Sequence, residues 1–182
     1  LGEMFKGQIL DAISNLSDTY SERLRQRNSN REQIDFLNNY LRFPQKVNRE
    51  ALELVAREWI GESQNTLEKA FKIEQNFKQK FDYSLENSFS NREDHIEFFL
   101  TEAQEGHCEY FATTMVLMLR SLDIPARIVN GYISDEWSAG QNRYIIRQEH
   151  AHSWVEVYAT IDLGDDVIGG WITFDPTPSS GI

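Results

Sequence analysis

The sequence predicts an α+β domain, with helices in its first half and an antiparallel sheet in its second half. Before residue 83, apolar side chains recur every three to five residues, as they do in amphipathic helices. After residue 125, segments rich in Val, Ile, Tyr and Trp alternate with acidic or glycine-bearing spacers. Helices followed by consecutive hairpin-like strands are typical of α+β domains.

The composition is that of a globular domain. The chain has 182 residues, of which 40% are hydrophobic, and this is enough to form a core in one domain. The net charge of −11 leaves no basic stripe for a phosphate backbone, so we expect no nucleic-acid partner.

Apolar runs are short, and none approaches the roughly 18 residues that span a bilayer. The chain opens Leu-Gly-Glu without a signal-peptide pattern, as a piece of a larger protein would. We therefore expect contact with a membrane only through segments absent from this chain.

Three helices are predicted in the first half. The first is a helical segment over residues 1–42 that the polar cluster at 25–31 interrupts. It ends at Phe43, because a residue that precedes proline disfavours the helical conformation. The second covers residues 49–60 with Gly61 as its stop. The third begins at Asn65, where Asn-Thr-Leu-Glu has the form of a capping box.

A fourth helix carries the single cysteine, Cys108, and ends before Asp123 and Pro125. Beyond it we expect strands over 126–133, 143–147, 151–159 and 171–174, separated by turns over 134–142 and 162–170. We divide the chain into an N-terminal helical segment, 1–62, that packs on or leads into the core, and a core domain, 63–182.

Cys108 allows two interpretations. It shares a helical face with Met115 and Leu119, and free cysteine is among the most buried residue types. It also lies in the first turn of its helix, where free N–H groups and the positive end of the helix dipole favour a thiolate. Gly106, two residues earlier, lets the backbone approach a substrate closely.

The stretch EHAHSWVEVYA, residues 149–159, contains two histidines. On a strand, His150, His152 and Trp154 share one face, and the other face carries Ala151, Ser153, Val155 and Val157. An imidazole could take the proton of a thiol and return it to a leaving group. Periodicity does not choose between His150 and His152, and a pair of surface histidines is the alternative.

The stretch GWITFDPTP, residues 170–178, ends a predicted strand at Asp175. A carboxylate beside a histidine strand could hold the imidazole in the tautomer that catalysis needs. An Asp-Pro pair is also a common turn signal. Taken together, the three segments supply a nucleophile, a base and a group that orients the base.

These segments resemble a known family. GHCEYFATTMVLMLRSLDIPARIVNGY, HSWVEVY and WITFDPTP occur in the order found in the bacterial transglutaminase-like domain of the transglutaminase and papain-like cysteine enzyme superfamily. The resemblance covers about residues 63–178. It implies a papain-like core with a catalytic cysteine at a helix N-terminus, packed on an antiparallel sheet that carries histidine and aspartate.

The resemblance assigns roles to matching positions. It makes Cys108 the nucleophile, His152 the general base and acid, and Asp175 the residue that orients the imidazole. It also chooses between the two histidines, because His152 stands at the motif position before Trp154 and Val155.

An oxyanion hole is implied as well, with the backbone N–H of Cys108 as one donor. The superfamily suggests an aromatic side chain as the second donor, for which Tyr83 is our candidate. His107, His150 and Trp154 are further candidates for contacts with the oxyanion or the substrate.

The expected function is a cysteine-nucleophile acyl transfer on protein or peptide carboxamides through a thioester. Two alternatives are hydrolysis of the same bond by a cysteine protease or amidase, and a catalytically silent binding module. A zinc site is a further alternative, although the spacing of its ligands matches no known signature; its ligands would be His107, Cys108, His150 and His152. We expect no cofactor.

The resemblance is to the membrane-anchored transglutaminase-like proteins in particular. It implies an extracytoplasmic domain, periplasmic or on the cell surface, of a membrane-anchored bacterial protein.

Overall fold

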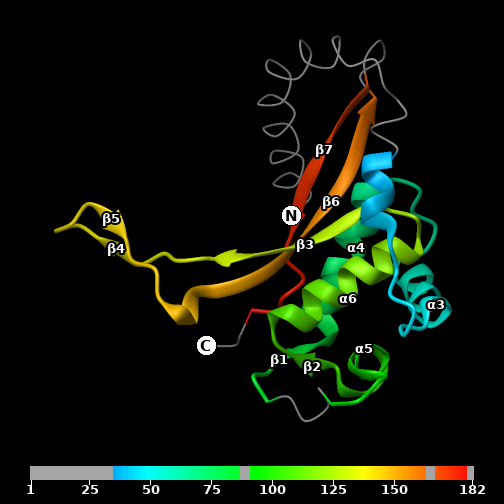
Figure 1. Ribbon diagram of the computed structural model, residues 1–182, viewed down its shortest axis with the longest axis horizontal. Helices are drawn as coiled ribbons and strands as arrows, with labels where there is room; N and C mark the ends of the chain where they lie inside the picture. The colour runs from blue at the N-terminus through cyan, green and yellow to red at the C-terminus, as the bar shows by residue number, and fades with distance from the viewer. Residues whose placement is uncertain (1–34, 87–90, 163–166, 180–182) are drawn as a thin grey trace.

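A computed structural model describes residues 35–86, 91–162 and 167–179. Two helices, α4 and α6, lie against one face of a three-stranded antiparallel sheet (Figure 1). This arrangement confirms the predicted α+β class. Most of the helix predicted over residues 1–42 lies outside the described residues. The described part ends in a 3₁₀ turn, Asn39–Leu41, ahead of Pro44.

The second and third predicted helices are confirmed. Helix α3, Arg49–Ile60, ends at Gly61, whose φ of 57° suits a residue without a Cβ atom. Helix α4, Thr66–Lys80, begins at Asn65, whose side chain accepts the N–H groups of Leu67 and Glu68. In the described ranges, no helix is both long and apolar enough to cross a bilayer.

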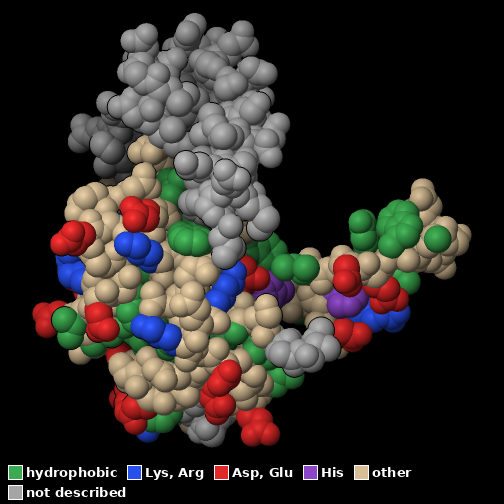
Figure 2. Space-filling model, turned by 180° about the vertical axis from the view of Figure 1, so that it is seen from behind, with side chains coloured by type: hydrophobic (Ala, Val, Ile, Leu, Met, Phe, Trp, Pro, Cys, Tyr) green, Lys and Arg blue, Asp and Glu red, His purple; other side chains and the backbone are tan. Residues whose placement is uncertain are grey.

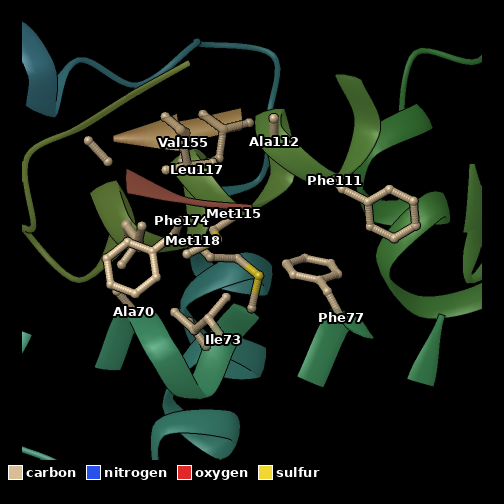
Figure 3. Packing of buried hydrophobic residues seen from close by; sticks show 14 of the residues in the cluster. Ala70, Ile73, Phe77, Phe111, Ala112, Met115, Leu117, Met118, Val155 and Phe174 are labelled. Atoms are coloured by element: carbon tan, nitrogen blue, oxygen red, sulfur yellow. The ribbon is translucent and has the colours of Figure 1, made fainter. Parts of the chain in front are cut away.

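Helix α6, Cys108–Ser121, is the centre of the core. It packs against α3 and α4 on one side and against β3 and β6 on the other. It is therefore buried nearly all round rather than along the single predicted face. Figure 3 shows residues of α4, α6 and the sheet in one cluster, including Ile73, Phe77, Met115, Met118, Val155 and Phe174.

The sheet has the order β3–β6–β7. Strand β3 is Ala126–Tyr132, β6 is Ala151–Asp162 and β7 is Val167–Phe174, and both pairs are antiparallel. Val155 and Val157 of β6 are fully buried, as the alternation of the sequence predicts for the face that meets the helices. On the opposite face of the sheet, Tyr40 of the 3₁₀ turn packs against Trp171 of β7, with the two ring centroids 4.7 Å apart.

The predicted turn over 162–170 is too long. Strand β7 begins at Val167, so Gly169 and Gly170 are strand residues rather than turn residues. The ring of Tyr158 covers Gly169 so closely that a Cβ atom there would overlap its hydroxyl group. Glycine at this position reflects close packing in the sheet, which composition alone does not distinguish from a turn.

Between β3 and β6 the chain forms an arm that projects from the body (Figure 1). The arm contains a short hairpin of β4, Trp137–Ser138, and β5, Arg143–Tyr144. The spacer predicted as a turn over 134–142 therefore contains a strand. Trp137 and Tyr144 meet edge to face with their ring centroids 4.9 Å apart and remain largely exposed, and apolar side chains gather near the end of the arm (Figure 2).

Short elements lead the chain into α6. Strand β1, Asp82–Tyr83, pairs in parallel with β2, Glu105–Gly106. Between them lie α5, His95–Phe98, and a π-helical turn, Phe99–Ala103.

The cap of α4 can be tested by substitution. We expect Asn65→Ala to lower the free energy of unfolding by about 1 kcal/mol, because two N–H groups lose their acceptor. The midpoint of urea denaturation measures this loss. Asn65→Asp keeps the accepting oxygen and should stay close to the parent. Equal midpoints for the two variants would contradict the capping role.

Candidate active site

Cys108 is the first residue of α6, and its side chain is partly buried. His107 precedes it as the N-cap residue, with an extended backbone. The carbonyl of His107 accepts the N–H of Tyr110 at 3.0 Å. The N–H groups of Cys108 and Glu109 come before the point where intrahelical hydrogen bonds begin. The thiol therefore lies beside free backbone donors at the positive end of the helix dipole.

Tyr83 lies beside the approach to the cysteine. It pairs with Gly106 across β1 and β2, and the N–H of Ser84 donates to the Gly106 carbonyl at 2.8 Å. Partial burial, and then negative charge on nearby Cys108, raise the pKa of Tyr83 above the ordinary value of a phenol. Its hydroxyl group is consequently a neutral hydrogen-bond donor near the thiol.

His152 and Asp175 are in direct contact. The imidazole Nε2 lies 2.8 Å from the Asp175 Oδ2. Since Phe174 pairs with Val155, the residue after β7 comes beside the start of β6, where His152 lies. An ionised carboxylate only accepts, so Nε2 donates and the neutral ring has its free lone pair on Nδ1.

Asp175 is held through both its side chain and its backbone. Its carboxylate Oδ1 accepts the backbone N–H of Thr177 at 3.0 Å. Its backbone N–H donates to Oε1 of Glu74 at 2.9 Å. Sequence reasoning did not single out Glu74. The available signal was an acidic residue among the inward-facing positions of α4, between Ala70 and Phe77.

The topology places the thiol at the same end of the domain as this pair. Strand β3 runs back along α6 and antiparallel to β6, so the start of α6 and the start of β6 share one end (Figure 1). Across the ranges that the structure describes, no hydrogen bond joins the Cys108 Sγ to the His152 ring. The structure thus brings His152 and Asp175 into contact and places Cys108 and Tyr83 together at the start of α6.

Trp154 packs against the histidine. Its ring is nearly parallel to that of His152, at 25° and with centroids 6.3 Å apart. It also lies over Gly131 on β3, where a Cβ atom would come within 2.6 Å of the indole. Gly131 is the register partner of His152, so the glycine makes room for the ring that flanks the imidazole.

The two other candidate histidines have local partners. His150 Nδ1 accepts the N–H of Arg147 at 3.0 Å within a 3₁₀ turn, Gln148–His150. The ring of His107 meets Tyr110 edge to face at 5.0 Å, and its Nδ1 lies 3.9 Å from a carboxylate oxygen of Glu109. No group of three potential metal ligands gathers within the described part of the chain. The four residues of the zinc alternative are therefore not brought together.

The close contact at Gly131 gives a prediction. Gly131→Ala should lower the free energy of unfolding by about 1–3 kcal/mol, because the added methyl group overlaps the Trp154 ring. Gly140→Ala is the matched control, since no atom lies within 4 Å of a Cβ placed there. In a Trp154→Leu background the cost of Gly131→Ala should shrink. An unchanged cost in that background, measured by denaturant unfolding, would rule out the contact.

The chain is similar to known proteins. Residues 53–176 match the model of the Transglutaminase-like superfamily. The uncharacterized protein YebA of Bacillus subtilis (strain 168) is 34% identical over 155 residues, which are 81% of this chain and 20% of YebA. The protein-glutamine gamma-glutamyltransferase of Pseudomonas aeruginosa is 34% identical over 84 residues, which are 46% of this chain and 12% of that protein.

A solved structure is also similar. The periplasmic domain of TgpA from Pseudomonas aeruginosa superimposes with a TM-score of 0.65 and 28% sequence identity, over 77% of this chain and 46% of that chain. The chain thus spans about a fifth or less of these two curated relatives and about half of the solved domain. The family model, in contrast, covers more than half of the chain. The protein belongs to the transglutaminase-like superfamily, in the broad class of cysteine acyltransferases and cysteine proteases.

Proposed function

We propose that this domain transfers acyl groups from protein or peptide carboxamides, with Cys108 as the nucleophile and a thioester as the intermediate. The observation that carries the proposal is the 2.8 Å contact of His152 with Asp175, at the end of the domain where α6 begins. The similarity to a protein-glutamine gamma-glutamyltransferase supports a carboxamide as the acyl donor.

In the first half-reaction, the Nδ1 atom of His152 takes the thiol proton of Cys108. The thiolate attacks the carboxamide carbon and forms a tetrahedral intermediate. The imidazolium then donates its proton to the leaving nitrogen, and ammonia departs as the C–N bond breaks. Asp175 accepts from Nε2 throughout, which holds the ring in place and stabilises its positive charge.

In the second half-reaction, a primary amine or water attacks the thioester carbon. His152 takes a proton from the attacking group and gives it to the departing sulfur of Cys108. An amine acceptor yields a new amide, and water yields a carboxylic acid. Tyr83 and Asp175 are both more than one third exposed, so water can enter this end of the domain and compete with an amine.

Two groups could stabilise the oxyanion of each tetrahedral intermediate. The backbone N–H of Cys108 is available at the start of α6, and the neutral hydroxyl group of Tyr83 lies near the same thiol. Trp154 would keep the His152 ring in its plane by packing against it.

The domain would act outside the cytoplasm as part of a membrane-anchored protein. The similarity to a domain described as periplasmic supports this location. The small share of the longer relatives that the chain covers agrees with a place in a larger protein.

The thiol gives the first functional test. We expect Cys108→Ala and Cys108→Ser each to lower kcat/KM by about 10³-fold or more, because the nucleophile is lost. The assays are incorporation of a labelled amine into a glutamine-containing peptide and release of ammonia in water alone. Far-UV circular dichroism checks that both variants keep the fold.

The comparison of the two assays also identifies the acceptor. Amine incorporation would identify a transglutaminase, whereas ammonia release without incorporation of the added amine would identify an amidase. Full activity in Cys108→Ala would overturn the proposed nucleophile.

Tyr83 gives a second test. If Tyr83 donates to the oxyanion, Tyr83→Phe should lower kcat by about 10²-fold with little change in KM, because the donor is lost. Because the pKa of Tyr83 is raised, the phenol stays protonated, and the loss should be constant between about pH 6 and 9. Tyr144→Phe removes an exposed hydroxyl group on the arm and serves as the control. An unchanged kcat in Tyr83→Phe would remove the residue from the site.

A further inference from the structure

Glu74 is a carboxylate in an apolar setting. It lies on the inward face of α4 among Ala70, Ile73 and Phe77, all three fully buried, and Glu74 itself is only 9% exposed. A buried charge lowers stability unless hydrogen bonds and opposite charges compensate for lost water. The partners of Glu74 should therefore show what it does.

One of these partners belongs to the candidate active site. Oε1 of Glu74 accepts the backbone N–H of Asp175 at 2.9 Å, across 101 sequence positions. The same oxygen lies 3.2 Å from Nζ of Lys78, a side chain that is 36% exposed. Gln75 donates to Oε2 at a longer distance of 3.4 Å. An ion pair with a partly exposed lysine contributes little to stability. The hydrogen bond to the Asp175 N–H is therefore the main interaction of the Glu74 carboxylate.

This bond fixes the backbone at the point where the sheet ends. Phe174 is the last residue of β7 to pair with β6, and Pro176 confines the preceding residue to an extended conformation. The Thr177 N–H holds one oxygen of the Asp175 carboxylate, which leaves the other oxygen to His152. With its own N–H tied to α4, Asp175 is held in both backbone and side chain.

We infer that Glu74 is a positioning residue, which aligns Asp175 with His152 through the Asp175 backbone N–H. The inference rests on the proposed function for its catalytic consequence, but the alignment itself is a property of the folded chain. Glu74 touches neither substrate nor thiol in this role. Its effect passes through one hydrogen bond to the carboxylate that orients the imidazole.

Two conservative variants separate the effect of the side-chain length of Glu74 from the effect of its charge. Glu74→Gln keeps the side-chain length and an accepting oxygen but removes the charge. Glu74→Asp keeps the charge but is one methylene shorter, so that it no longer reaches the Asp175 N–H. Glu68 provides matched controls, because it lies on the same helix, pairs with Lys72 at 3.4 Å and is far more exposed. Glu68→Gln and Glu68→Asp repeat the same chemical changes away from Asp175.

The first readout does not depend on activity. In a Cys108→Ala background, ¹⁵N-labelled protein should show a slowly exchanging Nε2–H proton of His152, identified by its loss in His152→Gln. We expect this signal in the parent, in Glu74→Gln and in both Glu68 variants. We expect rapid exchange of the same proton in Glu74→Asp, because the Asp175 carboxylate is no longer held against the ring.

The second readout is kinetic and uses the chain with Cys108 in place. Glu74→Asp should lower kcat by about 10- to 100-fold with little change in KM, because the base is misaligned. The kcat of Glu74→Gln should stay close to that of the parent, because the accepting oxygen is kept at the same reach. If the protein lacks acyl-transfer activity altogether, the proposed function fails, while the NMR comparison still decides the role of Glu74.

Two results would overturn the inference. One is an equal loss of the His152 proton signal in Glu74→Gln and Glu74→Asp, which would show that charge or general packing matters instead of reach. The other is hydrogen exchange of the Asp175 amide at the rate of an unprotected amide in the folded parent. This second measurement needs no variant, so it holds even if Glu74→Asp does not fold.

Discussion

The burial of α6 between two layers is the constraint on which the rest of the structure depends. Helices α3 and α4 cover one side of α6, and strands β3 and β6 cover the other. Such a helix cannot shift or rotate without breaking contacts in the core. Because protein interiors are close-packed, even a small displacement costs free energy. Its N-terminal turn holds the exposed Glu109 and the partly buried Cys108, and farther along only Thr113 and Arg120 are partly exposed.

The polar groups of the candidate site all lie where core elements begin or end. Cys108 begins α6, His152 is the second residue of β6, and Asp175 follows the last residue of β7. Tyr83 ends β1. Helix α6 and strands β6 and β7 bury apolar side chains and carry a polar residue of the site at or next to one end, whereas both residues of β1 are exposed. A mostly apolar core can therefore fix the relative positions of a thiol, an imidazole and a carboxylate.

Local signals in the sequence were sufficient for helices α3 and α4. The Asn65 cap, the Gly61 stop and the periodic apolar residues of α3 and α4 act within a few positions, so they could be interpreted without knowledge of the tertiary structure. The start of β7 could not be predicted, because Gly169 reflects the ring of Tyr158 on a neighbouring strand. The pattern of residues within one segment does not reveal which side chains of another strand pack against it.

The site shows the same division. A period of two put His150 and His152 on one face and could not separate them, whereas the structure gives His150 a backbone partner in a 3₁₀ turn and His152 a carboxylate partner. Whether Cys108, His152 and Asp175 act as a triad stays a prediction, as does the boundary between residues 62 and 63. Glu74 was missed because its partner is 101 positions away.

That separation also bears on how the domain folds. Contacts between α3 and α4 and the pairing of β6 with β7 link segments that follow each other closely, and such contacts generally form early. The packing of α3 on α6 and the bond from α4 to Asp175 close much longer loops, which makes them slow to form. Under the proposed mechanism, a chain with its helices and its β6–β7 hairpin formed but not yet packed together would hold a thiol apart from its base. Reactivity would then arise only once these long-range contacts form, and partly folded chains would be spared self-acylation.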